Sequence, residues 1–263
     1  MKKSRVHSEA MEARSVDAIP SGKEWQYEPK WDGFRCLLTR DSGAISMYSK
    51  SGQDLARYFP ELVVAALTLR EKSFVLDGEI VVPVDGRLSF DDLLQRIHPA
   101  TSRVRKLAEQ TPALFLAFDL LKKGKVELAG RSLCKRRPQL EEFAARYFRA
   151  KTLFRLSPAS LSLKDADRWL TSAGGGSDGV IAKRLDLPYQ AGSRDGMQKI
   201  KRYRSADCVI GGFRYGENLQ AGPRSWDRSS SDCMMPKACF ITWAFLQASR
   251  PRTSRPSRKS SRP

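Results

Sequence analysis

Segments rich in strand-forming residues, separated by short turns, fill residues 26–84 and limit the folds open to this chain. They are YEPKWDGFRCLLTR at 27–40, AISMYS at 44–49 and SFVLDGEIVVPV at 73–84. Asp41, Ser42 and Gly43 are turn residues between the first two segments. Short turns of this kind join antiparallel neighbours. The sequence therefore predicts antiparallel sheets in this region.

Helical patterns alternate with the strand segments. PELVVAALTLRE at 60–71 begins with a proline, which suits the first turn of a helix. Apolar residues recur at helical spacing over 135–150 and again after Ser162, and residues 89–110 also favour helix. Strands and helices without a strict β-α-β order predict an α+β fold. Further strands are expected at 111–121, 179–185 and 197–203.

Positive charge is in excess along the whole chain of 263 residues, which has a formal net charge of +18. Residues 224–263 carry nine Lys or Arg and two Asp, a net of +7, so residues 1–223 keep +11. Each phosphate that a basic protein neutralises releases bound counterions, so this excess favours a polyanionic partner. Nucleic acid is the expected partner, and the alternative is a surface whose charges only keep it solvated.

The cysteines and the apolar segments exclude other classes of protein. The five cysteines are scattered without a CxxC pair, and there are two histidines, so no structural zinc site is expected. The N-terminal sequence MKKSRVHSEAMEARS lacks the apolar stretch of a secretory signal, and the apolar run at 112–121 is too short to span a bilayer. We expect a cytoplasmic protein with no membrane partner.

The densest group of reactive side chains is Glu28-Pro-Lys30-Trp-Asp32-Gly33-Phe-Arg35. A lysine side chain becomes a nucleophile when desolvation or neighbouring cations lower its pKa. The planar guanidinium of an arginine matches phosphate oxygens, and Gly33 is interpreted as a flexible residue. No GxxxxGK(S/T) motif occurs, so nucleotide chemistry would use this segment rather than a P-loop. The alternative is a hairpin with exposed charges.

Two carboxylates flank a glycine in FVLDGEIVV at 74–82. Strand periodicity places Asp77 and Glu79 on one face, opposite Leu76 and Ile80. Buried carboxylates cost free energy unless a partner compensates them, and ribose hydroxyls or a magnesium-bound water would do so. The alternative is a strand at a sheet edge with one wet face.

Three later segments also carry candidate groups. Phe118, in the run FLAFDLL, is either a core residue or a platform for a purine. SDGVIAK contains an acid, Asp178, followed five positions later by Lys183. In QKIK, the strand period of two places Lys199 and Lys201 on one face, where they form either solvated surface or a site for a triphosphate.

The order and spacing of these segments are more specific than any one of them. KxDGxR, DGE, FD, DGVIAK and KxK, in this order, resemble the five-motif series of the covalent nucleotidyltransferases: DNA ligases, RNA ligases and mRNA capping enzymes. YEPKWDGFR, SKSGQDL, YFPEL, FVLDGEIVV, RIHPA and AFDLL are similar to strings of bacterial ATP-dependent DNA ligases of the ligase C and ligase D type. The resemblance covers residues 11–217.

The resemblance implies a fold and a reaction. Residues 11–204 would form an ATP-grasp-like nucleotidyltransferase (adenylation) domain of antiparallel sheets flanked by helices, and 205–217 the start of an OB-fold. Lys30 would be catalytic and attack the α-phosphate of ATP to form lysyl-AMP. The AMP would pass to the 5′-phosphate of a nick in double-stranded DNA, and the 3′-hydroxyl would displace it. We further expect a monomer located at the bacterial nucleoid.

The resemblance also implies roles for individual side chains around ATP and a divalent metal, Mg²⁺ or Mn²⁺. The nucleotide-binding residues would be Glu28 at the adenine, Arg35 and Lys50 at the sugar or phosphates, Glu79 at the ribose, Phe118 stacked on the adenine, Lys183, and Lys199 and Lys201 at the α-phosphate. The metal would be held by Glu79 and Asp178.

The sequence departs from the family pattern in two places. Asp178 stands where most relatives have Glu, so its shorter carboxylate would reach a metal through water. After ADCVIGGFRYGE, residues 218–263 do not resemble the family, and a shift of reading frame between 218 and 224 would restore an OB-like alternation of apolar residues. We therefore expect 218–263 to be a frame-shifted, disordered basic tail. Adenylation would then be slow and nick sealing weak or absent.

Two other functions stay open from the sequence. One is an RNA ligase or a capping-type nucleotidyltransferase, against which the ligase C and ligase D strings argue. The other is an inactive remnant that binds nucleic acid by charge alone. The presence of Lys30, Glu79, Lys199 and Lys201 argues against the second alternative.

Overall fold

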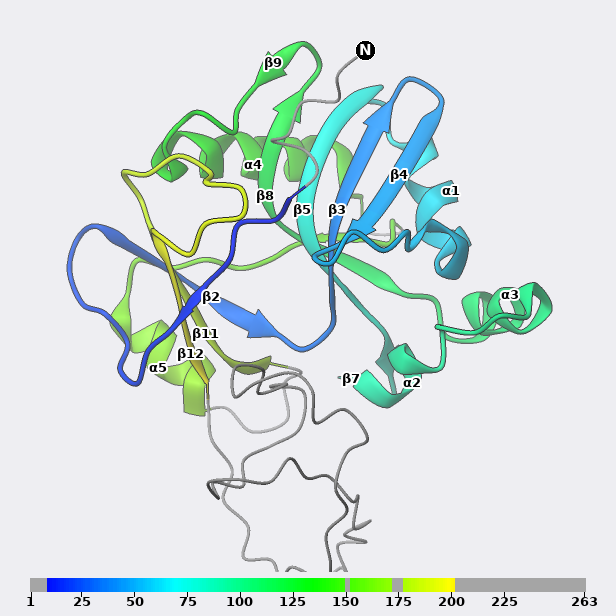
Figure 1. Cartoon of the computed structure of the whole chain (residues 1–263), viewed down its shortest axis with the longest axis horizontal. Helices are drawn as coiled ribbons and strands as arrows, with labels where there is room; N and C mark the ends of the chain where they lie inside the picture. Colours follow the sequence, from blue (N-terminus) through cyan, green and yellow to red (C-terminus); the bar gives the residue numbers. More distant parts are fainter. Residues whose placement is uncertain (1–8, 150–151, 172–176, 202–263) are drawn as a thin grey trace, which may run out of the picture. The chain divides into compact units, whose positions relative to one another are not determined.

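Two β-sheets form the framework of the protein in a computed structural model that describes residues 9–149, 152–171 and 177–201 (Figure 1). The larger sheet has the order β10 (Phe154–Leu156), β8 (Leu114–Lys123), β5 (Ser73–Val81), β3 (Phe34–Asp41) and β4 (Ala44–Ser49), and β9 (Val126–Glu127) pairs with β8. The smaller sheet has the order β1 (Arg14–Ser15), β12 (Met197–Lys201), β11 (Ser177–Arg184) and β2 (Trp25–Trp31).

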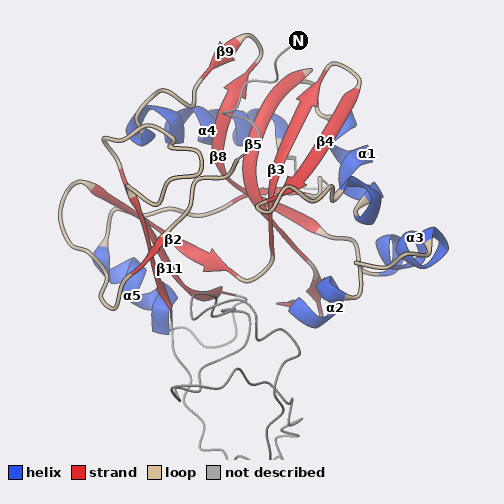
Figure 2. Ribbon diagram, viewed as in Figure 1, coloured by secondary structure: helices blue, strands red, loops and turns tan. Residues whose placement is uncertain are grey.

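Most strand pairs in both sheets are antiparallel, as the turn residues predicted, and the mixture of sheets and helices confirms the α+β class (Figure 2). The exceptions are β1 with β12 and β10 with β8, which run parallel. A short hairpin, β6 (Pro83–Val84) and β7 (Arg87–Leu88), follows β5.

The main hydrophobic core lies between one face of the larger sheet and two helices. These are α1 (Pro60–Thr68), which begins at a proline as expected, and α4 (Leu133–Tyr147). Leu62 and Ala66, one helical turn apart, face the core from α1, and Leu140 and Phe143 face it from α4. Alternate residues of β5 complete this core, because the period of a strand directs every second side chain to one face. They are Phe74, Leu76 and Ile80.

One face of the smaller sheet is apolar and packs on helix α5 (Leu163–Thr171). Tyr27, Val180, Ala182 and Ile200 are buried there, together with Ala166 of the helix. The opposite face of the same strands carries Glu28, Lys30, Lys183, Lys199 and Lys201. The pattern of alternation in these strands therefore separates an apolar face from a charged one.

The helix expected over 89–110 is in fact two helices, α2 (Phe90–Leu94) and α3 (Thr101–Gln110). A separate short 3₁₀ turn (Ala56–Tyr58) lies just before α1. Pro99 lies between them, and a proline disfavours helical conformation at the residue before it. Arg96, also between the two helices, is fully buried and donates to both carboxylate oxygens of Glu61, at 2.7 and 2.8 Å. The family-like strings RIHPA and YFPEL thus meet in an ion pair that supports the fold.

The part of the chain after residue 201 lies outside the described residues, and with it the expected OB-fold start at 205–217 and the expected tail at 218–263. Among the residues that the structure describes, no helix is long and apolar enough to cross a membrane.

Candidate active site

The registers of β2, β11 and β12 bring charged residues from three distant segments onto one face of the smaller sheet. Directly opposed residues in antiparallel strands point to the same face. The side chains therefore form three rows across the strands. These rows are Lys30, Gly179 and Lys201; Glu28, Ile181 and Lys199; and Gln26, Lys183 and Met197.

Lys30 forms an ion pair with Asp178, with 2.6 Å between Nζ and Oδ1. Asp178 lies at an irregularity of register, because Ser177 pairs with Trp31 while Gly179 already pairs with Lys30. Strict alternation would place Asp178 on the face opposite Gly179. The bulge instead allows its carboxylate to reach Lys30.

Glu28 and Lys183 form a second ion pair beside the first, and both side chains are buried. Lys183 Nζ lies 2.7 Å from Glu28 Oε2, and Gln26 Nε2 donates to Glu28 Oε1 at 2.8 Å. The same ammonium nitrogen lies 4.5 Å from the centre of the Phe118 ring. The pair therefore joins the smaller sheet to an aromatic residue of the larger sheet.

Across from these rows, Arg35 of β3 and Asp77 of β5 form a two-bonded pair. Nε and Nη2 of Arg35 lie 3.0 and 2.6 Å from the two oxygens of Asp77, and the Tyr189 hydroxyl donates to Asp77 Oδ2 at 2.7 Å. Asp77 is fully buried, and β5 lies between β3 and β8, so the interpretation of a wet edge strand is wrong. Asp77 obtains its compensation from Arg35 and Tyr189, and two donors of the Arg35 fork already have a carboxylate partner.

Glu79 lies two residues from Asp77 on β5 and pairs across the strands with Arg35. Burial raises the pKa of Glu79 to about 8, although the charges of Arg35 and Lys30 oppose this rise. Asp77 and Asp32 raise the pKa further, and Glu79 makes no hydrogen bond with another described side chain. A carboxylate in this position gains free energy from a proton or an added cation.

Phe118 lies at a second bulge, on β8. Asp119 pairs with Asp77 and Ala117 pairs with Gly78, so Phe118 between them has no partner on β5. Phe118 is half-buried and belongs to none of the hydrophobic clusters, which contradicts the interpretation of a core residue. Two cations face its ring, Lys183 Nζ at 4.5 Å and Arg35 Cζ at 5.2 Å from the ring centre.

Cations gather at the end of the smaller sheet near Lys30. Burial, with the neighbouring charges of Lys201, Lys50 and Lys30, lowers the pKa of Lys199. Lys50 forms an ion pair with Glu12 at 3.2 Å, and Arg194 pairs with the same carboxylate at 2.9 Å. Such a group of ammonium and guanidinium ions is suited to several phosphate oxygens.

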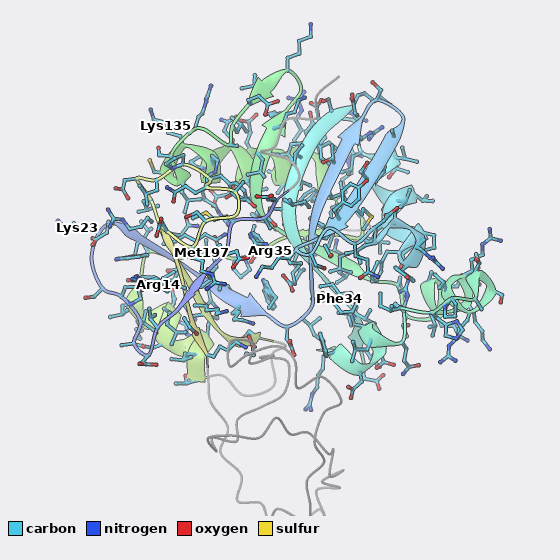
Figure 3. The ribbon with its side chains drawn as sticks, viewed as in Figure 1. Arg14, Lys23, Phe34, Arg35, Lys135 and Met197 are labelled. Carbon is cyan, nitrogen blue, oxygen red and sulfur yellow. The ribbon has the colours of Figure 1, made fainter. Side chains whose placement is uncertain are left out.

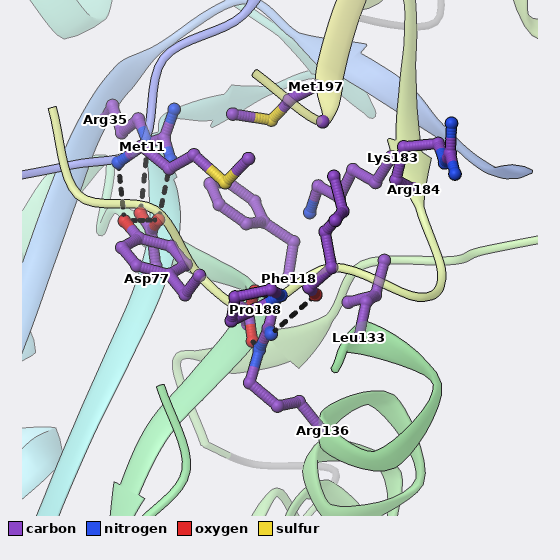
Figure 4. Close-up of a pocket in the computed structure, with 14 residues that line it drawn as sticks. Met11, Arg35, Asp77, Phe118, Leu133, Arg136, Lys183, Arg184, Pro188 and Met197 are labelled. Carbon is purple, nitrogen blue, oxygen red and sulfur yellow. Dashed lines mark hydrogen bonds and ion pairs between the residues drawn. The ribbon is translucent and has the colours of Figure 1, made fainter. Parts of the chain in front are cut away.

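A pocket lies between the two sheets, bordered by Met11, Phe118, Lys183 and Met197 (Figure 4). Arg35 and Met197 both lie in the central region between the sheets (Figure 3). The volume open to a water molecule is about 10 Å³, which is close to the room that a single water needs. A purine therefore enters this pocket only after side chains move.

The glycines of the three DG pairs are required by close packing rather than by flexibility, which corrects the interpretation of Gly33. None of them has a positive φ. A Cβ on Gly33 would lie 2.3 Å from the carbonyl oxygen of Ile80. A Cβ on Gly78 would lie 2.3 Å from the Phe115 ring, and a Cβ on Gly179 would lie 2.0 Å from the carbonyl oxygen of Ile200.

Sequence reasoning missed several residues that contact the candidate site. Met11 and Tyr189 lie in segments without any motif, so nothing in the sequence singled them out. Asp77 carried a signal, since it was recognised as a buried carboxylate in need of a partner. Glu12 and Arg194 were indistinguishable from other surface charges before the fold brought them together.

The two-sheet fold matches known ligase domains. The ligase domain of LigD from Mycobacterium tuberculosis aligns with a TM-score of 0.58 and 28% identity, over 76% of this chain and 62% of that one. A mycobacterial DNA ligase D complexed with ATP aligns with a TM-score of 0.56, also at 28% identity, over 76% and 62% of the two chains. The fold is that of a ligase nucleotidyltransferase domain.

The family model described as ATP dependent DNA ligase domain matches residues 9–201, and the chain belongs to this family. DNA ligase C2 of Mycolicibacterium smegmatis is 50% identical over 205 residues, which are 78% of this chain and 56% of the relative. DNA ligase C of M. tuberculosis is 44% identical over 206 residues, 78% of this chain and 57% of the relative. The resemblance to ligase C and ligase D is confirmed, and the chain spans somewhat more than half the length of these ligase C relatives.

Proposed function

We propose that this chain carries the adenylation site of an ATP-dependent DNA ligase, in which Lys30 takes AMP from ATP. The observation that supports this best is the row of Lys30 with Lys201, beside Lys199 and Asp178, on a sheet face that lies across from Glu79 and Phe118. A nucleophile, phosphate-binding cations and carboxylates for a metal are the groups that nucleotidyl transfer needs.

In the proposed first step, the Lys30 amine attacks the α-phosphorus of ATP. A bond forms between Nζ and phosphorus, the bond from phosphorus to the bridging oxygen breaks, and pyrophosphate leaves with that electron pair. Lys30 must first lose a proton and leave Asp178, which now holds its ammonium at 2.6 Å. Asp178 is also the group nearest to receive that proton.

The neighbouring cations would stabilise the charge that the phosphates carry through this step. Lys201 lies in the row of Lys30, Lys199 lies in the next row, and Lys50 contributes to the same positive field. Fixed cations lower the barrier most when they are held in place before the reaction, because they need no reorganisation. The backbone pairing of β12 with β11 supplies this rigidity for both lysines.

The nucleoside would occupy the pocket between the sheets. In this proposal Phe118 stacks on the adenine, Glu28 and Lys183 contact its edge, and Arg35 and Glu79 contact the sugar. The two cations over the Phe118 ring support this proposal, because they place the ring beside polar groups rather than in the core. Aromatic faces bind flat ligands by stacking.

Glu79 and Asp178 would fit a divalent metal, Mg²⁺ or Mn²⁺, because a cation would compensate the buried Glu79 carboxylate and would replace Lys30 beside Asp178 once Lys30 has moved away. Within residues 9–149, 152–171 and 177–201, no three His, Cys, Asp or Glu side chains gather closely enough to hold a metal by themselves. Magnesium is commonly held by one or two carboxylates together with waters and substrate phosphates, where it neutralises phosphate charge.

The later steps would join a nick in double-stranded DNA. The 5′-phosphate of the nick attacks the phosphorus of lysyl-AMP and frees Lys30, and the 3′-hydroxyl then attacks that 5′-phosphate and releases AMP. The net charge of +11 on residues 1–223 supports a DNA partner. The monomeric state and the location at the nucleoid belong to the same proposal.

Incubation with α-labelled ATP and magnesium, followed by denaturing electrophoresis, tests the first step. We expect label on the wild-type protein and none on Lys30→Ala. Lys30→Arg should also stay unlabelled, because a guanidinium remains protonated. Lys23→Ala is the control and should label normally, because Lys23 is exposed in the loop just before β2 (Figure 3).

Label that persists on Lys30→Ala would contradict the assignment of the nucleophile. A wild-type protein that takes no label would favour the inactive remnant. Nicked DNA and nicked RNA, offered in parallel to labelled protein, separate a DNA ligase from an RNA ligase.

A further inference from the structure

Tyr189 lies within a chain of hydrogen bonds that runs from Met11 to Arg35. The backbone N–H of Met11 donates to the Tyr189 hydroxyl at 2.9 Å, the hydroxyl donates to Asp77 Oδ2 at 2.7 Å, and Asp77 accepts two bonds from Arg35. Asp77 is fully buried and Tyr189 is 7% exposed, so water does not replace these partners.

The direction of each bond in this chain is fixed. The Met11 N–H is only a donor, so the hydroxyl of Tyr189 accepts there and has one proton left to give. Burial, with the charge of Asp77, raises the pKa of Tyr189 well above its ordinary range, so the hydroxyl keeps that proton. The proton can therefore be directed at Asp77.

The fold also fixes the Tyr189 ring. Its backbone N–H donates to the carbonyl of Ala129 at 2.9 Å, and the guanidinium of Arg136 lies 5.9 Å from the ring centre. Arg136 is itself held by two bonds to Asp119, each 2.9 Å long. A side chain that is held on every side can orient its neighbour accurately.

Arg35 is the end of this arrangement that borders the pocket, and its side chain is half-buried. Nε and Nη2 are bound to Asp77, whereas Nη1 makes no hydrogen bond with another described residue. The guanidinium also lies 5.2 Å from the Phe118 ring centre, at the border of the pocket. Asp77 thus determines the plane of the guanidinium, and the hydroxyl of Tyr189 determines the position of Asp77.

The geometry points to Tyr189 as a positioning residue for the nucleotide. It acts through Asp77 to hold Arg35 in the orientation that binds the sugar or phosphate side of ATP, and this rests on the proposed function. Loss of its hydroxyl leaves Asp77 with Arg35 alone and lets both side chains reorient.

Tyr189→Phe tests this, with Tyr27→Phe as a matched control. Tyr27 is also buried, and its hydroxyl donates to the Pro20 carbonyl at 2.7 Å, on the apolar face of the smaller sheet. We expect Tyr189→Phe to raise the ATP concentration for half-maximal labelling roughly tenfold, as for a lost hydrogen bond to a charged group. The rate at saturating ATP should change far less, and Tyr27→Phe should change neither.

A second comparison separates action through Arg35 from an independent effect. Arg35→Lys keeps the charge but removes the fork, so adding Tyr189→Phe to it should cause no further loss. If Arg35→Lys is not labelled, the rise of melting temperature with ATP supplies the same comparison.

Losses that multiply in the double variant, or a Tyr189→Phe variant that behaves like Tyr27→Phe, would overturn the inference while wild-type labelling upheld the proposed function. A wild-type protein that neither takes label nor is stabilised by ATP would overturn both.

Discussion

We expect Glu79 to make the stability of the fold depend on pH. Burial raises its pKa to about 8 from an ordinary 4.5, so the folded protein favours the protonated carboxyl. The contribution of the protonated Glu79 carboxyl to the stability of the folded state is complete below pH 4.5 and is lost as the pH rises through 8. Glu79→Gln stays neutral, so its free energy of unfolding relative to wild type should increase between pH 5 and pH 9.

Urea unfolding at pH 5, 7 and 9 measures this difference for Glu79→Gln. Glu109→Gln, at an exposed position on α3, is the control and should follow the wild type. A constant difference between Glu79→Gln and wild type at all three pH values would contradict the burial of a charged Glu79 carboxylate.

Phe118 should matter more for ATP than for stability. Removal of a core phenylalanine costs about 3–5 kcal/mol, and Phe115→Ala, at a fully buried position three residues earlier, should reach this range. Phe118→Ala should cost less, because Phe118 lies outside the hydrophobic clusters, and should raise the ATP concentration for half-maximal labelling. Thermal unfolding and ATP labelling of both variants measure these effects. A large fall in melting temperature of Phe118→Ala with unchanged ATP use would show that Phe118 acts as a core residue.

At the scale of the strand, Gly78 should be intolerant of any side chain. A Cβ would lie 2.3 Å from the Phe115 ring and 2.7 Å from the Leu116 carbonyl oxygen, and overpacking of a core typically costs about 1–3 kcal/mol. We therefore expect Gly78→Ala to be destabilised by at least this amount in urea. Gly43→Ala has open space around it and should stay within about 0.5 kcal/mol of wild type. Equal stability of the two variants would refute the packing role of Gly78.

Strand periodicity predicted most of the two sheets and the faces on which Asp77, Glu79, Lys199 and Lys201 lie. It did so because residues two apart in a strand lie on the same face, whether that face is exposed, as at Lys201, or buried, as at Asp77. Helix α1 was predicted from a different local signal, because Pro60 suits the first turn of a helix. The split between α2 and α3 was missed, although Pro99 was a visible signal.

The two bulges could not be predicted from the sequence. A single extra residue at Phe118 or Asp178 reverses the alternation, and it depends on the partner strand rather than on local preference. The hydroxyl of Tyr189 was missed for a related reason, because its partners Met11 and Asp77 lie 178 and 112 residues away. The motifs therefore identified the reactive side chains but not the contacts that hold them.

At the scale of the whole molecule, the basic charge should make DNA binding sensitive to salt. Neutralisation of about six phosphates would weaken binding roughly a thousandfold between 50 and 200 mM salt. Fluorescence anisotropy with nicked DNA over this range measures the slope. Lysyl-AMP formation without DNA is the control, and a flat binding curve would remove DNA from the proposed function.

The small volume of the pocket between the sheets has a consequence for how fast ATP can bind. With room for about one water, the pocket has to open before a purine enters, and if the open form is the less populated one, the apparent affinity for ATP is reduced by its fraction. Met11 and Met197 have unbranched side chains with low barriers to rearrangement, so they are the residues best able to create the opening. Loading would then be gated by the protein itself, and the same side chains would close over a captured nucleotide and slow its escape.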